Sequence, residues 1–268
     1  GYVSEHCDMD PGIGVHFFNI GNGENKPFVS KISPDGDMIW TRELAGRCSS
    51  VTLDNNENVC LTGFYSPTGN GSTNDIDFDP GPGFYGLPNA SASFVLKLDS
   101  AGDFIWAKPI RSGSILNFDI QADATGNLFI VGQFGCNPIN GNPTCTAYAY
   151  FDPETSAATP GAGLSDGYVY KLSGSGELLW VKIIGGSGKD QSNSIEINSD
   201  GNLVVSGYFS STMQVGSTVL TSNGSKDAYV TMLTPAGDFL WAKKIGGIGE
   251  ELSNGLATSN GSIYFAGS

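Results

Sequence analysis

The stretch SFVLKLDSAGDFIWAKPIRSG, residues 93–113, decides the fold, because the chain contains it in four versions. The other three are PFVSKISPDGDMIWTRELAG (27–46), GYVYKLSGSGELLWVKIIGG (167–186) and AYVTMLTPAGDFLWAKKIGG (228–247). All four tryptophans of the protein occupy the same position in these segments: Trp40, Trp106, Trp180 and Trp241. Their intervals of 66, 74 and 61 residues indicate a repeat architecture.

Each segment reads as a β-hairpin. In residues 94–98, Phe94, Leu96 and Leu98 alternate with Val95 and Lys97, and residues 104–108 follow the same period of two. A period of two is that of a β-strand. The turn between the two runs is rich in Ser, Asp and Gly, and Gly102 supplies the positive φ that a tight turn needs. Two such runs joined by such a turn predict a hairpin.

A second hairpin is predicted after each tryptophan-containing run, over residues 49–64, 118–134, 193–209 and 253–268. Its strands are apolar on both faces, as in the run Leu-Phe-Ile-Val at 128–131. A strand of that kind lies in a sheet that is covered on both sides. Small antiparallel sheets, stacked face to face around an axis, meet this requirement.

We therefore predict an all-β fold, a β-propeller of four-stranded antiparallel blades. A β-solenoid or a β-sandwich is the alternative, but a solenoid repeat is usually shorter, and a sandwich would not repeat its tryptophan at this spacing. We expect a single domain over residues 1–268. Its repeats are assigned to residues 1–46, 47–113, 114–186 and 187–247, with a partial repeat over 248–268 that pairs with the N-terminal hairpin.

The terminal blade is split, because the chain begins and ends within a repeat. Two arrangements remain open: a four-bladed ring closed by the split blade, and a segment of a longer array. Ring closure would hide the sheet edges. The absence of an initiating Met favours the segment.

Charged residues are few, 15% of the chain, and acidic ones dominate. There are 27 acidic against 13 basic residues, which gives a net charge of −14. Nucleic acids and anionic membrane surfaces are therefore not expected as partners, since both attract basic patches. No apolar run is long enough for membrane insertion. The low pI, the few lysines and the inserts rich in Ser, Thr, Asn and Gly lead us to expect an extracellular or cell-surface protein.

The five cysteines indicate one local disulfide. Cys136 and Cys145 lie in one polar insert, GCNPINGNPTCTAY, and a bond between them would stabilise that loop by about 2–3 kcal/mol. The alternative is a pair of ordinary thiols. The pairing of Cys7, Cys48 and Cys60 stays open, and one cysteine must be left over.

A motif with alternating aspartates occurs in three inserts, as HCDMDPGIG (6–14), DIDFDPGPG (75–83) and YAYFDPETS (148–156). Carboxylates followed by a tight turn can wrap Ca²⁺, which takes roughly six to eight oxygen ligands. In the alternative interpretation, Asp-Pro-Gly is a turn whose aspartate caps its own backbone. The candidate Ca²⁺ ligands are Asp75, Asp77 and Asp79 in the second copy, and Asp8 and Asp10 in the first.

Residues suited to catalysis are sparse. The two histidines, His6 and His16, lie in one insert, and the sequence has no HExxH, Gly-x-Ser-x-Gly or phosphate-binding loop. We therefore expect no enzymatic activity and assign no catalytic residue. The aromatic side chains of the inserts would either bind a glycan or protein or pack beneath their own loops: Phe17, Phe18, Phe84, Tyr85, Tyr148, Tyr150 and Phe151.

Several motifs resemble those of the bacterial β-propeller repeats called SBBP repeats. They are Trp106-Ala107-Lys108, Trp241-Ala242-Lys243, Gly126-Asn127 and Gly201-Asn202. The insert Asp77-Phe78-Asp79-Pro80-Gly81-Pro82-Gly83 is similar to versions in secreted surface proteins of the Bacteroidota. The resemblance covers nearly the whole chain, although the fourth copy lacks Asp-Pro-Gly. It implies an exported or cell-surface protein, but no activity and no catalytic residues.

These observations together predict a non-enzymatic extracellular or cell-surface propeller with a structural or adhesive role, as a stalk, an adhesin or a filament component. The expected partners are other copies of the chain, or a surface protein or glycan. The alternative is a glycan- or protein-binding propeller module that uses the insert loops.

Overall fold

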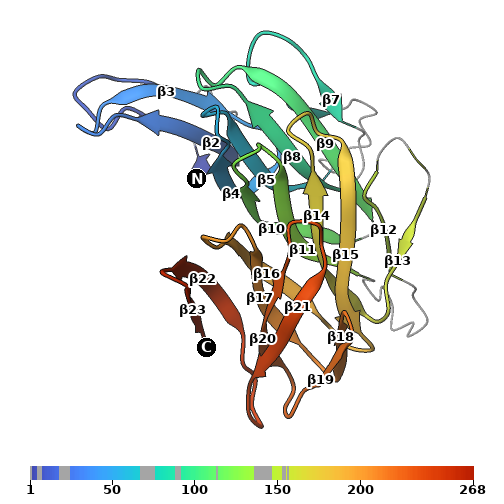
Figure 1. The fold of residues 1–268 in the computed structure, drawn as a ribbon. Coiled ribbons are helices and arrows are strands. Elements are labelled where there is room, and N and C mark those ends of the chain that lie inside the picture. The colour runs from blue at the N-terminus through green and yellow to red at the C-terminus, as the bar shows by residue number, and fades with distance from the viewer. Residues whose placement is uncertain are drawn as a thin grey trace.

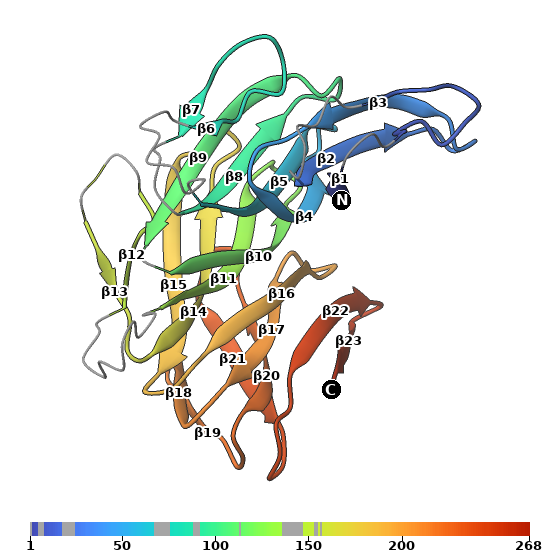
Figure 2. The ribbon, with the colours of Figure 1, turned by 180° about the vertical axis from the view of Figure 1, so that it is seen from behind.

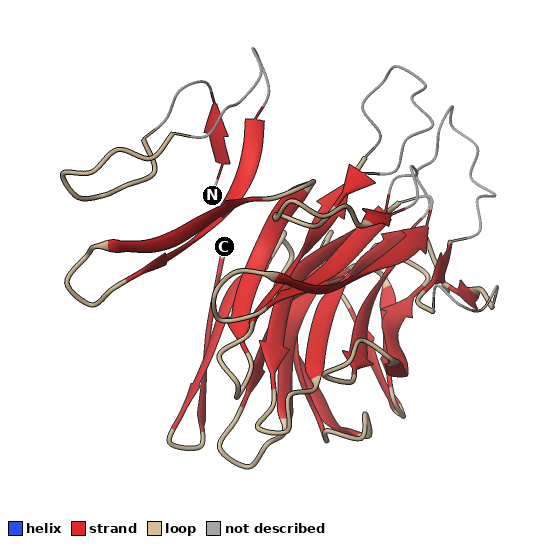
Figure 3. Ribbon diagram, turned by 90° about the horizontal axis from the view of Figure 1, so that it is seen from above, coloured by secondary structure: helices blue, strands red, loops and turns tan. Residues whose placement is uncertain are grey.

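The structure is a computed structural model, and its described residues form antiparallel β-sheets without a helix (Figures 1 and 3). Described are residues 2–4, 8–17, 25–66, 76–87, 92–112, 114–135, 147–152, 155 and 157–268. Nowhere in these residues is there an apolar helix of the length that crossing a membrane requires.

Three complete four-stranded units form the body of the molecule. Unit 1 contains β4 (Arg47–Leu53), β5 (Val59–Tyr65), β8 (Ala92–Leu98) and β9 (Phe104–Ser112). Unit 2 contains β10 (Ile115–Ala122), β11 (Leu128–Gly135), β14 (Ser165–Leu172) and β15 (Leu178–Gly186). Unit 3 contains β16 (Gln191–Ile197), β17 (Leu203–Phe209), β20 (Asp227–Leu233) and β21 (Phe239–Ile245). In each unit the strands are neighbours in chain order, so every unit has the same topology.

Two incomplete sheets flank these units. The N-terminal sheet holds β1 (Tyr2–Ser4), β2 (Asn25–Ile32) and β3 (Met38–Glu43), and the C-terminal hairpin holds β22 (Ser253–Ser259) and β23 (Ser262–Gly267). Figures 1 and 2 show both on the same side of the molecule, with the three complete units curving between them. The expected pairing of 248–268 with the N-terminal hairpin is not formed between the described strands, which belong to separate sheets.

Both kinds of predicted hairpin are confirmed by the strand registers. The tryptophan-containing hairpins are β2–β3, β8–β9, β14–β15 and β20–β21. The others are β4–β5, β10–β11, β16–β17 and β22–β23. In the first kind, the turn glycines have φ between +83° and +92°, because a residue with a side chain is strained there: Gly36, Gly102, Gly176 and Gly237.

The units pack through their faces. The first strands lie side by side, since β10 contacts both β4 and β16, and β16 also contacts β22. Each of the three hydrophobic clusters joins two neighbours: the N-terminal sheet with unit 1, unit 1 with unit 2, and unit 2 with unit 3. The core is therefore made of junctions between units. This explains why β5, β11 and β17 are apolar on both faces.

Short strands in the inserts extend two of these sheets. Strand β12 (Tyr148–Tyr150) pairs with β9 and with β13 (Thr159–Pro160). Strand β18 (Thr212–Val215) pairs with β15 and with β19 (Thr218–Thr221). The insert of each later unit thus adds to the outer strand of the unit before it. In unit 1 the insert forms a separate hairpin of β6 (Ile76–Asp77) and β7 (Gly86–Leu87).

Candidate functional site

The Asp-Pro-Gly loop of unit 1 is held by its own aspartates. Asp77 Oδ1 accepts hydrogen bonds from the backbone N–H groups of Asp79 at 3.0 Å and Tyr85 at 2.9 Å. Asp79 Oδ1 accepts one from Gly81 N–H at 2.8 Å. A Cβ atom on Gly83 would lie 2.2 Å from Asp79 Oδ2, so the glycine makes room for the carboxylate. These contacts are those of a side-chain-capped turn.

The N-terminal loop has the same arrangement. Asp8 Oδ1 accepts bonds from Asp10 N–H at 3.0 Å and His16 N–H at 2.9 Å, and Asp10 Oδ1 accepts one from Gly12 N–H at 2.8 Å. The bonds from His16 and Asp10 lower the pKa of Asp8. Two loops separated in the chain therefore share one capping pattern, which the aspartate spacing encodes.

The calcium site stays a prediction. Asp75 lies outside the described residues, so the set Asp75, Asp77 and Asp79 is not seen together. Within the described part of the chain, no three His, Cys, Asp or Glu side chains gather in a way that would hold a metal ion.

The predicted disulfide between Cys136 and Cys145 also lies outside the described residues. Cys48 and Cys60 are both on unit 1, but the register places Cys48 opposite Gly63 and Cys60 opposite Thr52. They are therefore not cross-strand partners. Burial raises the pKa of Cys48 to about 11 and that of Cys60 to about 12, which keeps both thiols protonated at neutral pH.

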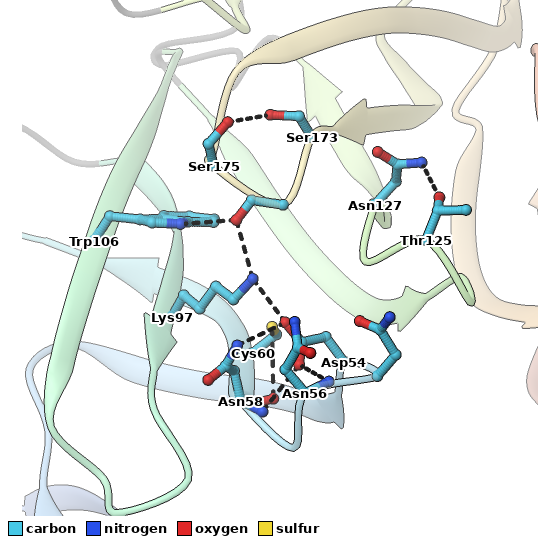
Figure 4. A network of polar contacts seen from close by, with 12 residues as sticks. Asp54, Asn56, Asn58, Cys60, Lys97, Trp106, Thr125, Asn127, Ser173 and Ser175 are labelled. Atoms are coloured by element: carbon cyan, nitrogen blue, oxygen red, sulfur yellow. Dashed lines mark hydrogen bonds and ion pairs between the residues drawn. The ribbon is translucent and has the colours of Figure 1, made fainter.

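The tryptophans join each unit to the next. Trp106 on β9 of unit 1 donates its indole N–H to the carbonyl oxygen of Gly174, 3.2 Å away in the β14–β15 turn of unit 2. The Lys97 ammonium donates to the same oxygen at 3.0 Å (Figure 4). A Cβ on Gly176 would lie 3.2 Å from the Trp106 ring, so the turn packs flat against the indole. We call this set of contacts the junction clamp.

The junction clamp recurs at the two other complete junctions. Trp40 donates to the Ser100 carbonyl at 3.0 Å, and Trp180 donates to the Pro235 carbonyl at 3.2 Å. A lysine again shares each oxygen, Lys31 at 3.4 Å and Lys171 at 3.1 Å. Each acceptor is the residue two positions before the turn glycine. The common position of the tryptophans in the sequence thus corresponds to a common contact between units.

In the junction clamp between units 1 and 2, Lys97 also forms an ion pair within unit 1. Its ammonium lies 2.8 Å from Asp54 Oδ2, and both side chains are almost fully buried. Burial alone would raise the pKa of Asp54, but bonds from Lys97, Asn58 and Asn56 outweigh it and lower the pKa to about 2. The β4–β5 turn, strand β8 and the next unit are therefore tied through one lysine (Figure 4).

A buried acidic pair lies where unit 2 meets the insert of unit 3. Asp166 Oδ2 accepts bonds from Ala162 and Gly163 N–H, while Asp190 accepts bonds from Gly186 and Ser210 N–H. Both side chains are fully buried. Burial raises both pKa values, to about 7 for Asp190, and the charge of Asp166 adds to the effect on Asp190.

A groove of about 810 Å³ opens between the N-terminal sheet and unit 1. Its walls include Arg47, Tyr65 and the Asp-Pro-Gly loop from Ile76 to Pro80. The Arg47 guanidinium lies over the Phe64 ring, 5.8 Å from its centre. At the rim, Lys26 and Glu43 form an ion pair at 2.9 Å. The structure thus places Asp77 and Asp79 of the candidate site in the wall of this groove.

Sequence reasoning missed the lysines and the turn carbonyls of the junction clamp. A signal was present, because the hairpins at 27–46, 93–113 and 167–186 each have a lysine nine residues before the tryptophan and a glycine four before it. The acceptor is a backbone oxygen, however, and every residue has one. Only the packing of the units selects it.

Comparisons with known proteins support a repeat protein of propeller-like type. No family model matches the chain. It is 24% identical over 243 residues to an uncharacterized WD repeat-containing protein, L264, of Acanthamoeba polyphaga mimivirus, covering 83% of this chain and 17% of that protein. The chain thus spans less than a fifth of that relative's length.

A solved structure of a protein of unknown function from Bacteroides caccae covers 83% of this chain and 91% of its own, with 12% identity. Its TM-score is 0.28, so that likeness carries no argument about the fold.

Proposed function

We propose that this chain is a non-enzymatic, extracellular or cell-surface β-propeller repeat protein with a structural or adhesive role, as part of a stalk, an adhesin or a filament. The observation that carries the proposal is the junction clamp, which joins successive units with the same tryptophan, lysine and glycine contacts. Repeat proteins gain stability from the contacts between neighbouring units, and the curvature of the stack gives them an extended surface. Such a body suits a spacer or an adhesive surface.

Each unit is, in this proposal, one blade of an SBBP-type propeller. Its support is the common four-strand order of the three complete units, together with the repeat motifs quoted above. The WD repeat-containing relative also favours the propeller class. The net charge of −14 and the polar inserts support an exported protein that does not bind nucleic acid.

Surface labelling tests the location and the role together. Antibodies against the purified chain are applied to intact and to permeabilised producing cells, and beads coated with the chain are offered to the same cells. We expect labelling of intact cells and retention of coated beads above beads coated with an unrelated acidic protein. Labelling that appears only after permeabilisation would contradict the proposal.

The groove beside the Asp-Pro-Gly loop favours a second candidate, a glycan- or protein-binding module. Its volume of about 810 Å³ lies in the range of ligand sites, and it combines an aromatic wall with the cation of Arg47. A glycan array then gives hits that Arg47→Ser weakens and Lys189→Ser, an exposed lysine elsewhere, leaves unchanged. An array without hits would remove glycans as ligands.

A further inference from the structure

A lysine, an asparagine and a buried aspartate meet beside strand β21 of unit 3. The Lys244 ammonium donates hydrogen bonds to Asn223 Oδ1 at 2.8 Å and to the carbonyl oxygen of Thr221 at 2.5 Å. The same nitrogen lies 3.5 Å from Asp227 Oδ2, and the side chain of Asp227 has no exposed surface. One amine group thus contacts both a primary amide and a buried carboxylate.

Asp227 also holds the asparagine in place. Its two oxygens accept the backbone N–H of Asn223 at 3.2 and 3.1 Å, and Oδ1 accepts the N–H of Gly224 at 3.4 Å. A Cβ atom on Gly246 would lie 2.4 Å from Asp227 Cγ, so this glycine makes room for the carboxylate. Asn223 itself is exposed. The amide is therefore positioned by a capped turn, and one side of it is open to water.

The equivalent loop of unit 2 keeps the aspartate but has neither of the other two groups. Its aspartate, Asp166, accepts the backbone N–H of Ala162, so an alanine stands where unit 3 has the asparagine. Ile183 has the register position of Lys244, since each is opposite the tyrosine of its neighbouring strand. The capped turn therefore forms without the lysine and the asparagine, and their presence in unit 3 calls for another role.

A lysine amine beside an amide carbonyl can form an isopeptide bond once the amine is neutral. Reacting atoms that are ready to combine lie about 3–3.5 Å apart. Because Lys244 Nζ already contacts the amide oxygen of Asn223, rotation about the last torsion of that side chain turns Cγ toward Nζ. Asp227 can accept the first proton, since the transfer replaces a buried carboxylate and an ammonium by two neutral groups.

We propose that Lys244 and Asn223 join in an intramolecular isopeptide bond, with Asp227 as the proton carrier. Nζ attacks Cγ, so the bond between Nζ and Cγ forms and the bond between Cγ and Nδ2 breaks. Nζ gives up two of its three protons, the first of them to Asp227, and keeps the third in the new amide. Nδ2 takes up both protons and leaves as ammonium into the water beside the exposed turn. Nothing is oxidised or reduced, and no further reactant is needed.

The bond would fasten two units to each other. Asn223 follows the hairpin β18–β19, which pairs with β15 of unit 2, whereas Lys244 lies on β21 of unit 3. Strand β19 also contacts β21 directly (Figure 1). Hydrogen bonds between units can open one by one, but a covalent bond holds when they do. The inference goes beyond the proposed function, because this chemistry does not depend on where the chain is located.

Intact-chain mass spectrometry of the reduced, denatured protein tests the bond. During incubation at neutral pH, the wild-type chain should become lighter than its sequence mass by one molecule of ammonia. Digestion should then give a branched peptide that joins the segments around Asn223 and Lys244. Asn223→Ala and Lys244→Arg should keep the full mass, since each removes one reacting group. Asp227→Asn should form the bond about 100-fold more slowly, because it removes the proton carrier.

Lys243→Arg is the matched control, since Lys243 is an exposed lysine on the same strand, and this variant should lose ammonia as the wild type does. Lys244→Arg separates the isopeptide bond from cyclisation of the Asn-Gly backbone, which releases ammonia without the lysine. Circular dichroism checks that each variant is folded. Asn223→Ala and Lys244→Arg both leave the bonds of Asp227 to the backbone in place, so the test does not depend on the folding of the aspartate variant.

A wild-type chain that keeps its full mass after prolonged incubation would overturn the inference. Loss of ammonia that persists in Lys244→Arg would also do so, as would a digest that yields residues 223 and 244 only in separate peptides. Full mass in a chain that still labels intact cells would leave the proposed function standing. A cross-linked chain found only inside cells would remove that function but not this bond.

Discussion

The indole nitrogen of Trp106 lies 3.2 Å from the carbonyl oxygen of Gly174, a residue 68 positions later in the chain. The tryptophan of each complete junction thus stabilises the contact with the next unit, in addition to packing on its own sheet. Stability in such an array comes from the units and from their junctions. Damage to one junction is therefore expected to separate the units on either side of it.

Trp106→Ala should lower the free energy of unfolding by about 3–5 kcal/mol, because Trp106 is only 9% exposed and its removal leaves a cavity at the junction. Trp106→Phe, which keeps a ring but loses the hydrogen bond, should cost about 1 kcal/mol for the bond. Denaturant unfolding measures both values. Ile105→Ala, on the exposed face of the same strand, is the control. Equal losses for Trp106→Ala and Ile105→Ala would contradict the role of the junction.

Lys97→Met should be strongly destabilising, by about 3–5 kcal/mol, since it leaves the Asp54 carboxylate buried without its cation. Asp54→Asn combined with Lys97→Met should recover much of this loss. Thermal unfolding of the two variants at neutral pH gives the comparison. A Lys97→Met variant as stable as the wild type would show that Asp54 does not depend on the ion pair.

The ion pair of Asp54 with Lys97 also makes the stability of the fold depend on pH. The folded-state pKa of about 2 lies below the ordinary value of 3.8, so the stabilisation is present above pH 3.8 and is lost as the pH falls towards 2. In Lys97→Met that pKa rises, and acid unfolding should begin at a higher pH. Acid titration followed by tryptophan fluorescence checks this shift, and the double variant should not show it.

Asp190 gives a pH dependence of stability that is opposite in sign to that of Asp54. Its folded-state pKa of about 7 lies above the ordinary value of 3.8, so the folded state favours the protonated acid. The contribution of Asp190 to stability is therefore complete below pH 3.8 and is lost as the pH rises to 7. Asp190→Asn should reduce this decline between pH 4 and 7, as measured by urea unfolding at several pH values, and the part that remains comes from Asp166, whose pKa is also raised. Asp200→Asn, at an exposed turn, should leave the decline in place.

Asp79→Ala tests the Asp-Pro-Gly loop. Loss of the bond to Gly81 N–H should speed hydrogen exchange in residues 76–87 while the rest of the chain exchanges as before. Hydrogen exchange with mass spectrometry measures the effect, and Asp238→Ala in a distant turn is the control. The calcium prediction has its own measurement on the wild type, a higher melting temperature in Ca²⁺ than in chelator, and equal temperatures would remove it.

Much of the fold was predictable because its determinants are local. Alternation of side chains within residues 94–98 sets a strand, and the glycine of the turn sets the sign of φ at Gly102, whatever the rest of the chain does. The aspartate spacing in the two Asp-Pro-Gly loops is local in the same sense, since Asp77 and Asp79 bond to groups within eight residues.

The candidate site was less predictable, because its contacts cross between units. The sequence by itself determined that four tryptophans share one position, that each belongs to a hairpin, and that the strands are covered on both faces. Only the tertiary structure decided that Trp106 binds Gly174 of the next unit, that β12 and β18 extend the preceding units, and that the two terminal sheets remain apart. The physical reason is that the periodicity of side chains can be read directly from the sequence. The hydrogen-bond acceptors of the tryptophans are backbone carbonyl oxygens, which every residue has, so only the packing of the units selects among them.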